Sequence, residues 1–298
     1  MSSYLETRRT FLSSAGLLLA GCAAGVRAGR PDRVRFGVRS PFTTKDLGER
    51  AELLKRLGYD GIELGPEFLS VTAESIRERL ASAGIAVGAI VGSIQLLAPD
   101  PEKRRAGIEL TRTRLGMAQA LGAAGVIEVP TFGECRFPEV AKEPPPHALE
   151  DRLLAEALTQ LVPDAARTGV PILLEPLTRK ETHYMNLQSH GVRIIESAGA
   201  AGRVRLLSDF YHMQLEERDI ARTLAQHGRH TAYVHLADGE ARTRPGSLPF
   251  DYRPGFRALK SHGFSGWLTM EFRLAPGEDA PSALARGLEY IRRQWDEA

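Results

Sequence analysis

The chain has 298 residues, of which 43% are hydrophobic and 26% are charged, and its formal net charge is +2. This length suits one large core, because barrels of about 250 residues commonly fold as a single domain. Positive and negative side chains are interspersed along the chain, so the charge pattern does not favour a nucleic-acid partner. With only two cysteines, Cys22 and Cys135, a scaffold built on several disulfides is excluded.

The N-terminus has the pattern of an export signal rather than of a folded element. Thr7-Arg8-Arg9-Thr10-Phe11-Leu12 precedes a short apolar stretch at 15–20, which is typical of a twin-arginine signal peptide. The apolar stretch is too short to cross a bilayer as an ordinary transmembrane helix. We therefore expect export by the twin-arginine route, to the periplasm or the cell envelope.

The end of this signal predicts a lipid anchor. Leu19-Ala20-Gly21-Cys22 is similar to a bacterial lipobox, in which the cysteine becomes the lipidated first residue of the mature chain. Cys22 would then tether the protein to the membrane. Ordinary signal-peptidase cleavage after Ala24 or Ala28 is the alternative. The expected division is 1–21 as signal peptide, 22–32 as linker and 33–298 as the folded domain.

The first half of the folded domain alternates short apolar runs with segments of helical periodicity. Helices are predicted at Asp46–Leu57 and Thr72–Ala83, where apolar residues recur at i, i+3 and i+4 and a glycine follows as the stop. No apolar run is followed by Gly-x-Gly-x-x-Gly, so a dinucleotide-binding sheet is not favoured. The strands expected in this half are Val34–Arg39, Gly61–Leu64, Ala86–Val91 and Gly125–Val129.

Features after the fourth and fifth strands are less specific. The proline-rich segment 138–147 predicts a loop over the barrel mouth, although an inert surface loop has the same composition. Cys135 is compatible with the pocket mouth, and equally with a plain loop or a buried thiol. His183 fits either a substrate contact or an exposed loop position.

In the second half, four apolar runs each end in a residue that can bind a metal. These residues are separated by 34, 26 and 36 residues, about one strand and one helix each. The pattern predicts an α/β fold, a single-domain (β/α)8 TIM barrel, in which the C-terminal ends of the strands meet on one face. The four residues are Glu175, Asp209, His235 and Glu271.

Taken singly, each of the four residues is compatible with a helix cap, an ion pair or a structural imidazole. Together, at the same end of four consecutive strands, they predict one divalent-cation site. Three carboxylates and one imidazole form an oxygen-rich ligand set, which favours Mn²⁺, with Mg²⁺ or Co²⁺ as alternatives, over a thiolate-bound zinc.

The residues around these positions resemble the xylose isomerase-like superfamily. Within it, the words Glu175-Pro-Leu-Thr-Arg-Lys-Glu181, Asp209-Phe-Tyr-His212-Met and Val-His235-Leu-Ala-Asp-Gly-Glu-Ala-Arg242 are similar to sugar epimerases of the D-tagatose and D-psicose 3-epimerase kind. The resemblance extends over about residues 33–295 and is most specific in the second half. It implies a small carbohydrate substrate, and a homo-oligomer is compatible with it.

The resemblance also implies roles for single residues. Glu175 and Glu271 match glutamates that bind the metal and act as an acid/base pair, while Asp209 and His235 match residues that only bind it. Three further residues match positions that contact the substrate in the family: Glu181, His212 and Arg242.

Ligand chemistry leads to the same reaction class. A divalent cation that chelates a sugar carbonyl and its neighbouring hydroxyl stabilises the enediolate formed when the adjacent carbon loses its proton. Glu175 and Glu271 come from different strands, so one can take the proton and the other can return it to the opposite face. The expected activity is that of a metal-dependent sugar isomerase or epimerase.

Other functions use part of the same residues. A 3-keto-glycoside lyase would use the same metal and base but eliminate an aglycone, which suits a protein outside the membrane. A non-catalytic sugar-binding lipoprotein would tolerate the loss of one glutamate. An endonuclease IV-like repair enzyme is disfavoured, because Ile90-Val-Gly-Ser, Glu128-Val-Pro-Thr and Asp251-Tyr-Arg lack the further histidines that a three-metal cluster needs.

Overall fold

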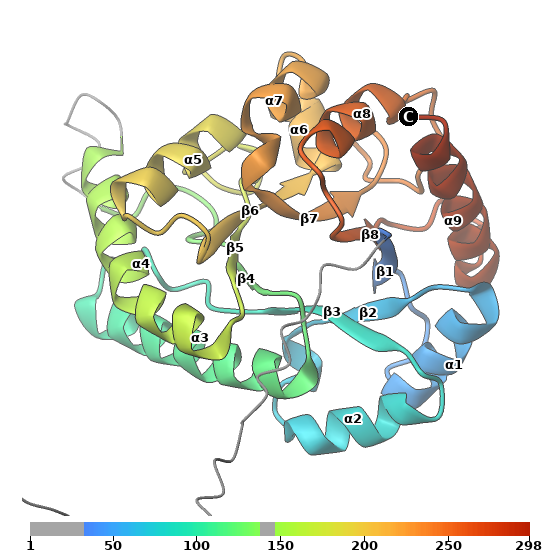
Figure 1. Ribbon diagram of the computed structural model, residues 1–298, viewed down its shortest axis with the longest axis horizontal. Helices are drawn as coiled ribbons and strands as arrows, with labels where there is room; N and C mark the ends of the chain where they lie inside the picture. Colours follow the sequence, from blue (N-terminus) through green and yellow to red (C-terminus); the bar gives the residue numbers. More distant parts are fainter. Residues whose placement is uncertain (1–32, 138–146) are drawn as a thin grey trace, which may run out of the picture. The chain divides into compact units, whose positions relative to one another are not determined.

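The computed structural model describes residues 33–137 and 147–298, which form one compact unit. Eight parallel strands follow one another around a closed barrel, with the last strand paired to the first (Figure 1). The predicted single-domain TIM barrel is confirmed. The strands are β1 (Arg35–Ser40), β2 (Gly61–Leu64), β3 (Ala86–Val91), β4 (Val126–Glu128), β5 (Ile172–Leu174), β6 (Val204–Asp209), β7 (Thr231–Leu236) and β8 (Trp267–Glu271).

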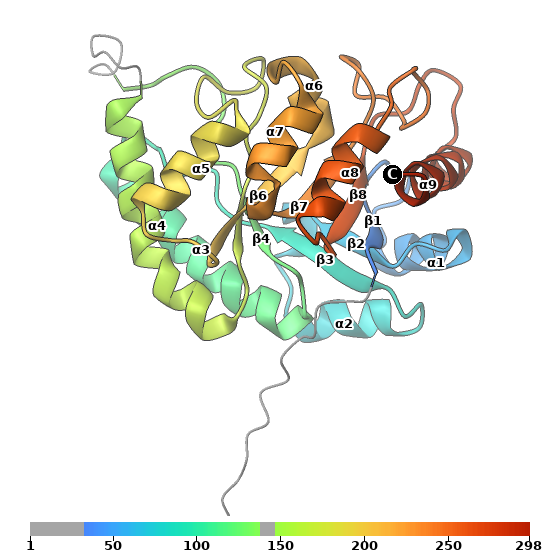
Figure 2. The same ribbon diagram turned by 45° about the horizontal axis from the view of Figure 1, so that its top comes forward.

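Helices surround the barrel on its outer side, as the tilted view also shows (Figure 2). In the part of the chain that the structure describes, none of the helices is both long and apolar enough to cross a membrane. The helices are α1 (Leu47–Leu57), α2 (Ala73–Ala81), α3 (Pro101–Leu121), α4 (Ala148–Thr168), α5 (Gln188–Ser197), α6 (Phe210–Glu216), α7 (Ile220–His227), α8 (Arg253–Ser261) and α9 (Ala280–Asp296), with short 3-10 turns η1 (Pro66–Phe68) and η3 (Gly228–His230).

Local signals place the first helices where the sequence predicts them. Asp46 caps α1 by accepting a hydrogen bond from the backbone N–H of Glu49 at 2.9 Å, and Gly58 ends the helix in the left-handed region at φ 82°. Thr72 caps α2 in the same way through Ser75 N–H. The predicted strands at Gly61–Leu64 and Ala86–Val91 coincide with β2 and β3, and the other two differ by one residue at each end.

The floor of the barrel is filled unequally by its two halves. Tyr233 of β7 and Trp267 of β8 are buried inside the barrel, whereas the facing strands carry glycines. A Cβ atom on Gly61 would lie 2.4 Å from the Trp267 ring, and one on Gly88 would lie 2.7 Å from the Tyr233 hydroxyl. The bulky residues of the second half therefore depend on missing side chains in the first, because barrel interiors pack as solid cores.

Three sequence predictions lie outside the described residues. They are the export signal at 1–21, the lipidated Cys22 in the linker 22–32, and nearly all of the loop at 138–147.

Candidate metal centre

The four predicted ligand residues lie together at the C-terminal ends of consecutive strands. Glu175 directly follows β5, Asp209 and Glu271 end β6 and β8, and His235 is the next-to-last residue of β7. One donor atom from each lies within 4.8 Å of all the others. The convergence follows from the barrel, since parallel strands bring their C-terminal ends to one face.

His235 occupies the centre of this group. Its Nδ1 atom lies 2.8 Å from Glu271 Oε2, 3.3 Å from Glu175 Oε1 and 4.0 Å from Asp209 Oδ2. The ring is buried, and Nδ1 has no partner that meets hydrogen-bond geometry. A buried imidazole nitrogen that faces three carboxylates is an arrangement a bound cation would complete.

Glu63 orients that imidazole from the other side, and the sequence analysis missed it. Its Oε2 atom lies 2.7 Å from His235 Nε2, and its Oε1 atom lies 3.3 Å from Arg39 Nε. Carboxylates that accept the far N–H of a metal-binding histidine fix the ring and its tautomer. The signal available in the sequence was weak, because Gly-Ile-Glu-Leu reads as an ordinary buried strand with one acid.

Asp209 has two functions at once. Oδ1 accepts a hydrogen bond from the backbone N–H of Tyr211 at 2.8 Å and caps α6, while Oδ2 faces the ligand group. The helix-cap interpretation and the ligand interpretation of this residue are therefore compatible.

Arg242 contacts two carboxylates of the same group, which agrees with its predicted place at the substrate site. Nη2 lies 2.8 Å from Asp209 Oδ2 and 2.7 Å from Glu271 Oε2, and the guanidinium stacks over the Tyr211 ring at 4.6 Å. Arg242 Nη1 also lies 3.8 Å from Glu181 Oε1. The structure thus places Arg242 and Glu181, two of the three predicted substrate-contact residues, beside the ligand group.

His212 points its free nitrogen toward the centre. The backbone N–H of Thr178 donates to His212 Nδ1 at 3.0 Å, so the neutral ring carries its proton on Nε2. Nε2 is buried without a hydrogen-bond partner and lies 3.4 Å from Asp209 Oδ2. This N–H is a donor that a polar ligand of the cavity can accept.

The electrostatics of the two glutamates differ. Burial raises the pKa of Glu175. Burial acts in the same direction on Glu271, but the positive charges of Arg242 and His235 outweigh it and hold the pKa of Glu271 well below its usual range. For His235, burial lowers the pKa, and the carboxylates of Glu63 and Glu271 outweigh it and raise that pKa.

A cavity of about 560 Å³ opens above the ligand group. Its floor carries Glu175, His235 and Glu271, and one wall is formed largely by apolar side chains of the first half of the barrel. Among these lining residues, Ile94 and Phe132 are 55% and 40% exposed to solvent. The structure places Phe132 in this wall.

The donor set fits a divalent cation. Three carboxylates with one imidazole match hard cations such as Mn²⁺ and Mg²⁺, and the orphaned Nδ1 of His235 supplies the single nitrogen. His183 does not line the cavity, and its ring contacts Glu150 instead.

Sugar epimerases are among the relatives of this chain. The chain is 27% identical over 258 residues to a 3-dehydro-D-guloside 4-epimerase of Escherichia coli, covering 84% of this chain and 96% of that protein. It is 29% identical over 255 residues to an L-ribulose 3-epimerase of a Methylomonas species, covering 81% and 85%.

Solved structures agree in fold. A crystal structure of 3-keto-D-glucoside 4-epimerase from E. coli superposes with a TM-score of 0.77 at 25% identity, covering 88% of this chain and 100% of that chain. D-psicose 3-epimerase superposes with a TM-score of 0.76 at 19% identity, which supports the fold alone. The profile of one family matches residues 51–294, and the chain belongs to that family, the xylose isomerase-like TIM barrels.

Proposed function

We propose that this protein is a divalent-metal-dependent sugar epimerase or isomerase that moves a proton at the carbon beside a carbonyl group. The observation that carries the proposal is the convergence of Glu175, Asp209 and Glu271 on the unpartnered Nδ1 of His235 at the floor of a cavity. The sugar epimerases among its relatives support the reaction class.

Glu175, Asp209, His235 and Glu271 would hold the cation, with Glu63 fixing the His235 ring. When bound, a divalent ion supplies Lewis-acid polarisation of the substrate carbonyl. The ligand set favours Mn²⁺, with Mg²⁺ or Co²⁺ as alternatives.

Proton transfer falls to the two glutamates. Glu175 and Glu271 reach the cavity from β5 and β8, so their carboxylates approach a bound sugar from different strands. One carboxylate oxygen removes the proton from the carbon beside the carbonyl, and the other carboxyl returns a proton to the opposite face. Inversion at that carbon is epimerisation.

The neighbouring residues would bind and orient the sugar. The Nε2–H of His212 donates to a substrate hydroxyl oxygen, and Glu181 accepts a hydrogen bond from another hydroxyl. Arg242 holds the reactive end of the sugar and, lying beside Asp209 and Glu271, offsets their negative charge.

The apolar wall favours a keto-glycoside over a free ketose. Ile94, Leu110 and Phe132 offer apolar surface at the cavity mouth, where a hydrophilic free sugar has little to contact. Elimination of an aglycone is a second candidate reaction. The apolar wall would contact the aglycone, and elimination starts with the same proton abstraction as epimerisation.

Incubation with Mn²⁺ in deuterated water tests the proposal. A panel of ketoses and 3-keto-glycosides is followed by NMR and mass spectrometry. An epimerase yields an isomer with solvent deuterium at one carbon, and a lyase releases the aglycone and an unsaturated keto-sugar. Sugar binding with no exchange or product across the panel would leave only a non-catalytic binding protein.

We propose export by the twin-arginine route and lipidation at Cys22 on the sequence pattern at the N-terminus. Replacing Arg8 and Arg9 by lysine should retain the precursor inside the cell. Cys22→Ser should release the mature protein from membranes, and fractionation with immunoblotting measures both. An unprocessed native protein in the cytosol contradicts this proposal.

A further inference from the structure

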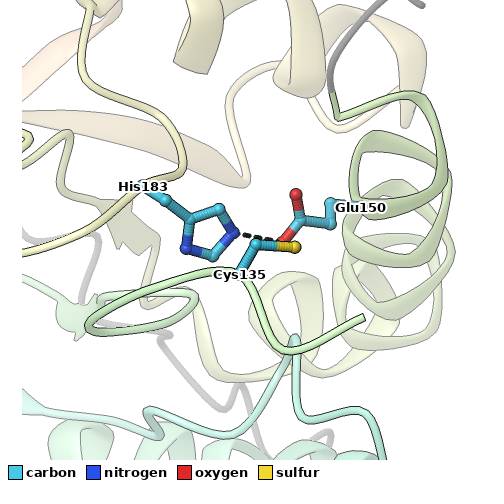
Figure 3. Close-up of side chains that lie close together, drawn as sticks. All are labelled: Cys135, Glu150 and His183. Atoms are coloured by element: carbon cyan, nitrogen blue, oxygen red, sulfur yellow. Dashed lines mark hydrogen bonds and ion pairs between the residues drawn. The ribbon is translucent and has the colours of Figure 1, made fainter. Parts of the chain in front are cut away.

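A second group of metal-binding side chains lies at the rim of the barrel, outside the candidate metal centre. Cys135 is in the loop after β4, Glu150 in the first turn of α4, and His183 in the loop after β5 (Figure 3). The thiol sulfur, one carboxylate oxygen and one imidazole nitrogen all lie within 4.8 Å of one another. Three separate segments thus bring three different donor types to one point.

The orientation of His183 leaves one nitrogen available to a cation. Nδ1 lies 2.9 Å from the backbone carbonyl oxygen of Gly133, which can only accept, so Nδ1 carries a proton. In the neutral ring, Nε2 therefore has a lone pair, and it lies 2.6 Å from Glu150 Oε1. Two lone pairs at this distance require a proton between them, and a metal ion can replace that proton once the two donors move apart. A backbone carbonyl on the far nitrogen is also typical of metal-bound histidines.

Glu150 is held in place for the same role. Its side chain is buried, and its second oxygen, Oε2, lies 2.9 Å from Nδ1 of His147. Metal-binding carboxylates are commonly anchored in this way through the oxygen that does not bind.

We propose that Cys135, Glu150 and His183 bind a zinc ion, with water as the fourth ligand. A thiolate with an imidazole and a carboxylate is a ligand set that zinc accepts. Tetrahedral zinc holds its donors about 3.4 to 3.6 Å apart. The donors here lie between 2.6 Å and 4.8 Å apart, so small side-chain rotations suffice.

Such an ion would stabilise the mouth of the cavity. The two loops already pair, since Gly133 N–H donates to the Glu181 carbonyl at 2.8 Å and His183 N–H donates to the Gly133 carbonyl at 2.9 Å. These loops carry Phe132 of the apolar wall and Glu181 beside Arg242. Zinc would cross-link them through side chains, at a position separate from the candidate metal centre.

Cobalt titration of the metal-free, reduced protein tests the proposal. Cobalt bound to a thiolate gives a near-ultraviolet charge-transfer band, and the ligands of the candidate metal centre include no sulfur. We expect the band in the wild type and in Cys22→Ser, which removes the other thiol, and its loss in Cys135→Ser. Zinc should displace the cobalt and abolish the band.

Metal stoichiometry supplies a second measurement. Cys135 is exposed, so Cys135→Ser should fold, and it should bind one equivalent of zinc fewer than the wild type in equilibrium dialysis. Glu271→Gln should weaken the candidate metal centre but retain the thiolate band, which separates the two sites. The absence of the band in the wild type, with equal zinc stoichiometry in Cys135→Ser, would show that the cluster is only a His183–Glu150 ion pair.

Discussion

The two halves of the barrel contribute differently to its cavity. Strands β5 to β8 supply all four candidate ligands at their ends, whereas β1 to β4 and their loops supply apolar wall residues such as Ile94 and Phe132. Chemistry and substrate shape are thereby assigned to different parts of the chain. Loops at this face of a barrel can vary without changes to the strands that carry the ligands.

Packing beneath the cavity shows the same division. Tyr233 and Trp267 of the second half fill the barrel interior, and Gly61 and Gly88 of the first half leave room for them. The Tyr233 ring packs edge-on at 5.6 Å from the His235 ring, so the bulky floor also supports the ligand above it. The second half therefore holds both the ligands and the bulky residues beneath them, and glycines of the first half make room for those residues.

Removing a proton-transfer group of the second half should have the largest effect. Glu175→Gln and Glu271→Gln keep the side-chain shape but cannot exchange a proton, so kcat should fall by about 10² to 10⁴-fold. Steady-state kinetics measure this with the substrate found in the deuterium screen. Glu240→Gln, an exposed carboxylate paired with Lys180, is the control and should retain wild-type turnover. A Glu271→Gln protein with wild-type kcat would falsify the assignment.

Glu128 tests whether a buried acid at a strand end of the first half is structural. It ends β4 and bonds to Thr111 Oγ1 and Ser93 N–H, and burial raises its pKa from 4.5 to about 8. The folded state thus retains a proton that the unfolded chain releases. The free energy of unfolding should fall as the pH rises from 4.5 to 8, by at most about 4 to 5 kcal/mol.

Glu128→Gln should remove this part of the pH dependence, which urea unfolding at a series of pH values measures. The same substitution at exposed Glu78 of α2 should leave the wild-type slope. An unchanged slope in Glu128→Gln would contradict the structural role and place the titration elsewhere.

One residue of the first half should matter for the metal. Glu63→Gln weakens the acceptor of His235 Nε2, and changes at such positions typically reduce metal affinity by about 10 to 100-fold. Isothermal titration with Mn²⁺ measures the effect. Glu67→Gln removes the other carboxylate beside Arg39, at 3.7 Å, without a contact to His235, and should bind the metal normally. Equal affinities in the two variants would remove Glu63 from the site.

The smallest effect is expected at the apolar wall. Phe132→Ala should raise KM about tenfold for a keto-glycoside with an apolar aglycone, if roughly 50 Å² of contact is lost at about 25 cal/mol/Å². The change for a free ketose should be smaller, and kcat should change little. Val71→Ala, another exposed apolar side chain outside the cavity lining, should leave KM unchanged. Equal KM changes for both substrates would argue against an aglycone at this wall.

The sequence by itself determined the barrel and the four-residue ligand group. The signals that predicted them are local or periodic, and they can be recognised without knowledge of tertiary contacts. Examples are the helix cap Asp46, the stop glycine Gly58 and the regular spacing from Glu175 to Glu271. The barrel then places the strand ends together by its closure.

Only the tertiary structure decided which other acids and imidazoles belong to a site. Glu63 and Glu128 both stand in or at the end of apolar strands, yet one supports His235 and the other anchors the loop at Ser93. His183 turned to Glu150 rather than to the cavity. Such roles depend on which side chains the packing brings from distant segments, and this information is not contained in the local pattern around any one residue.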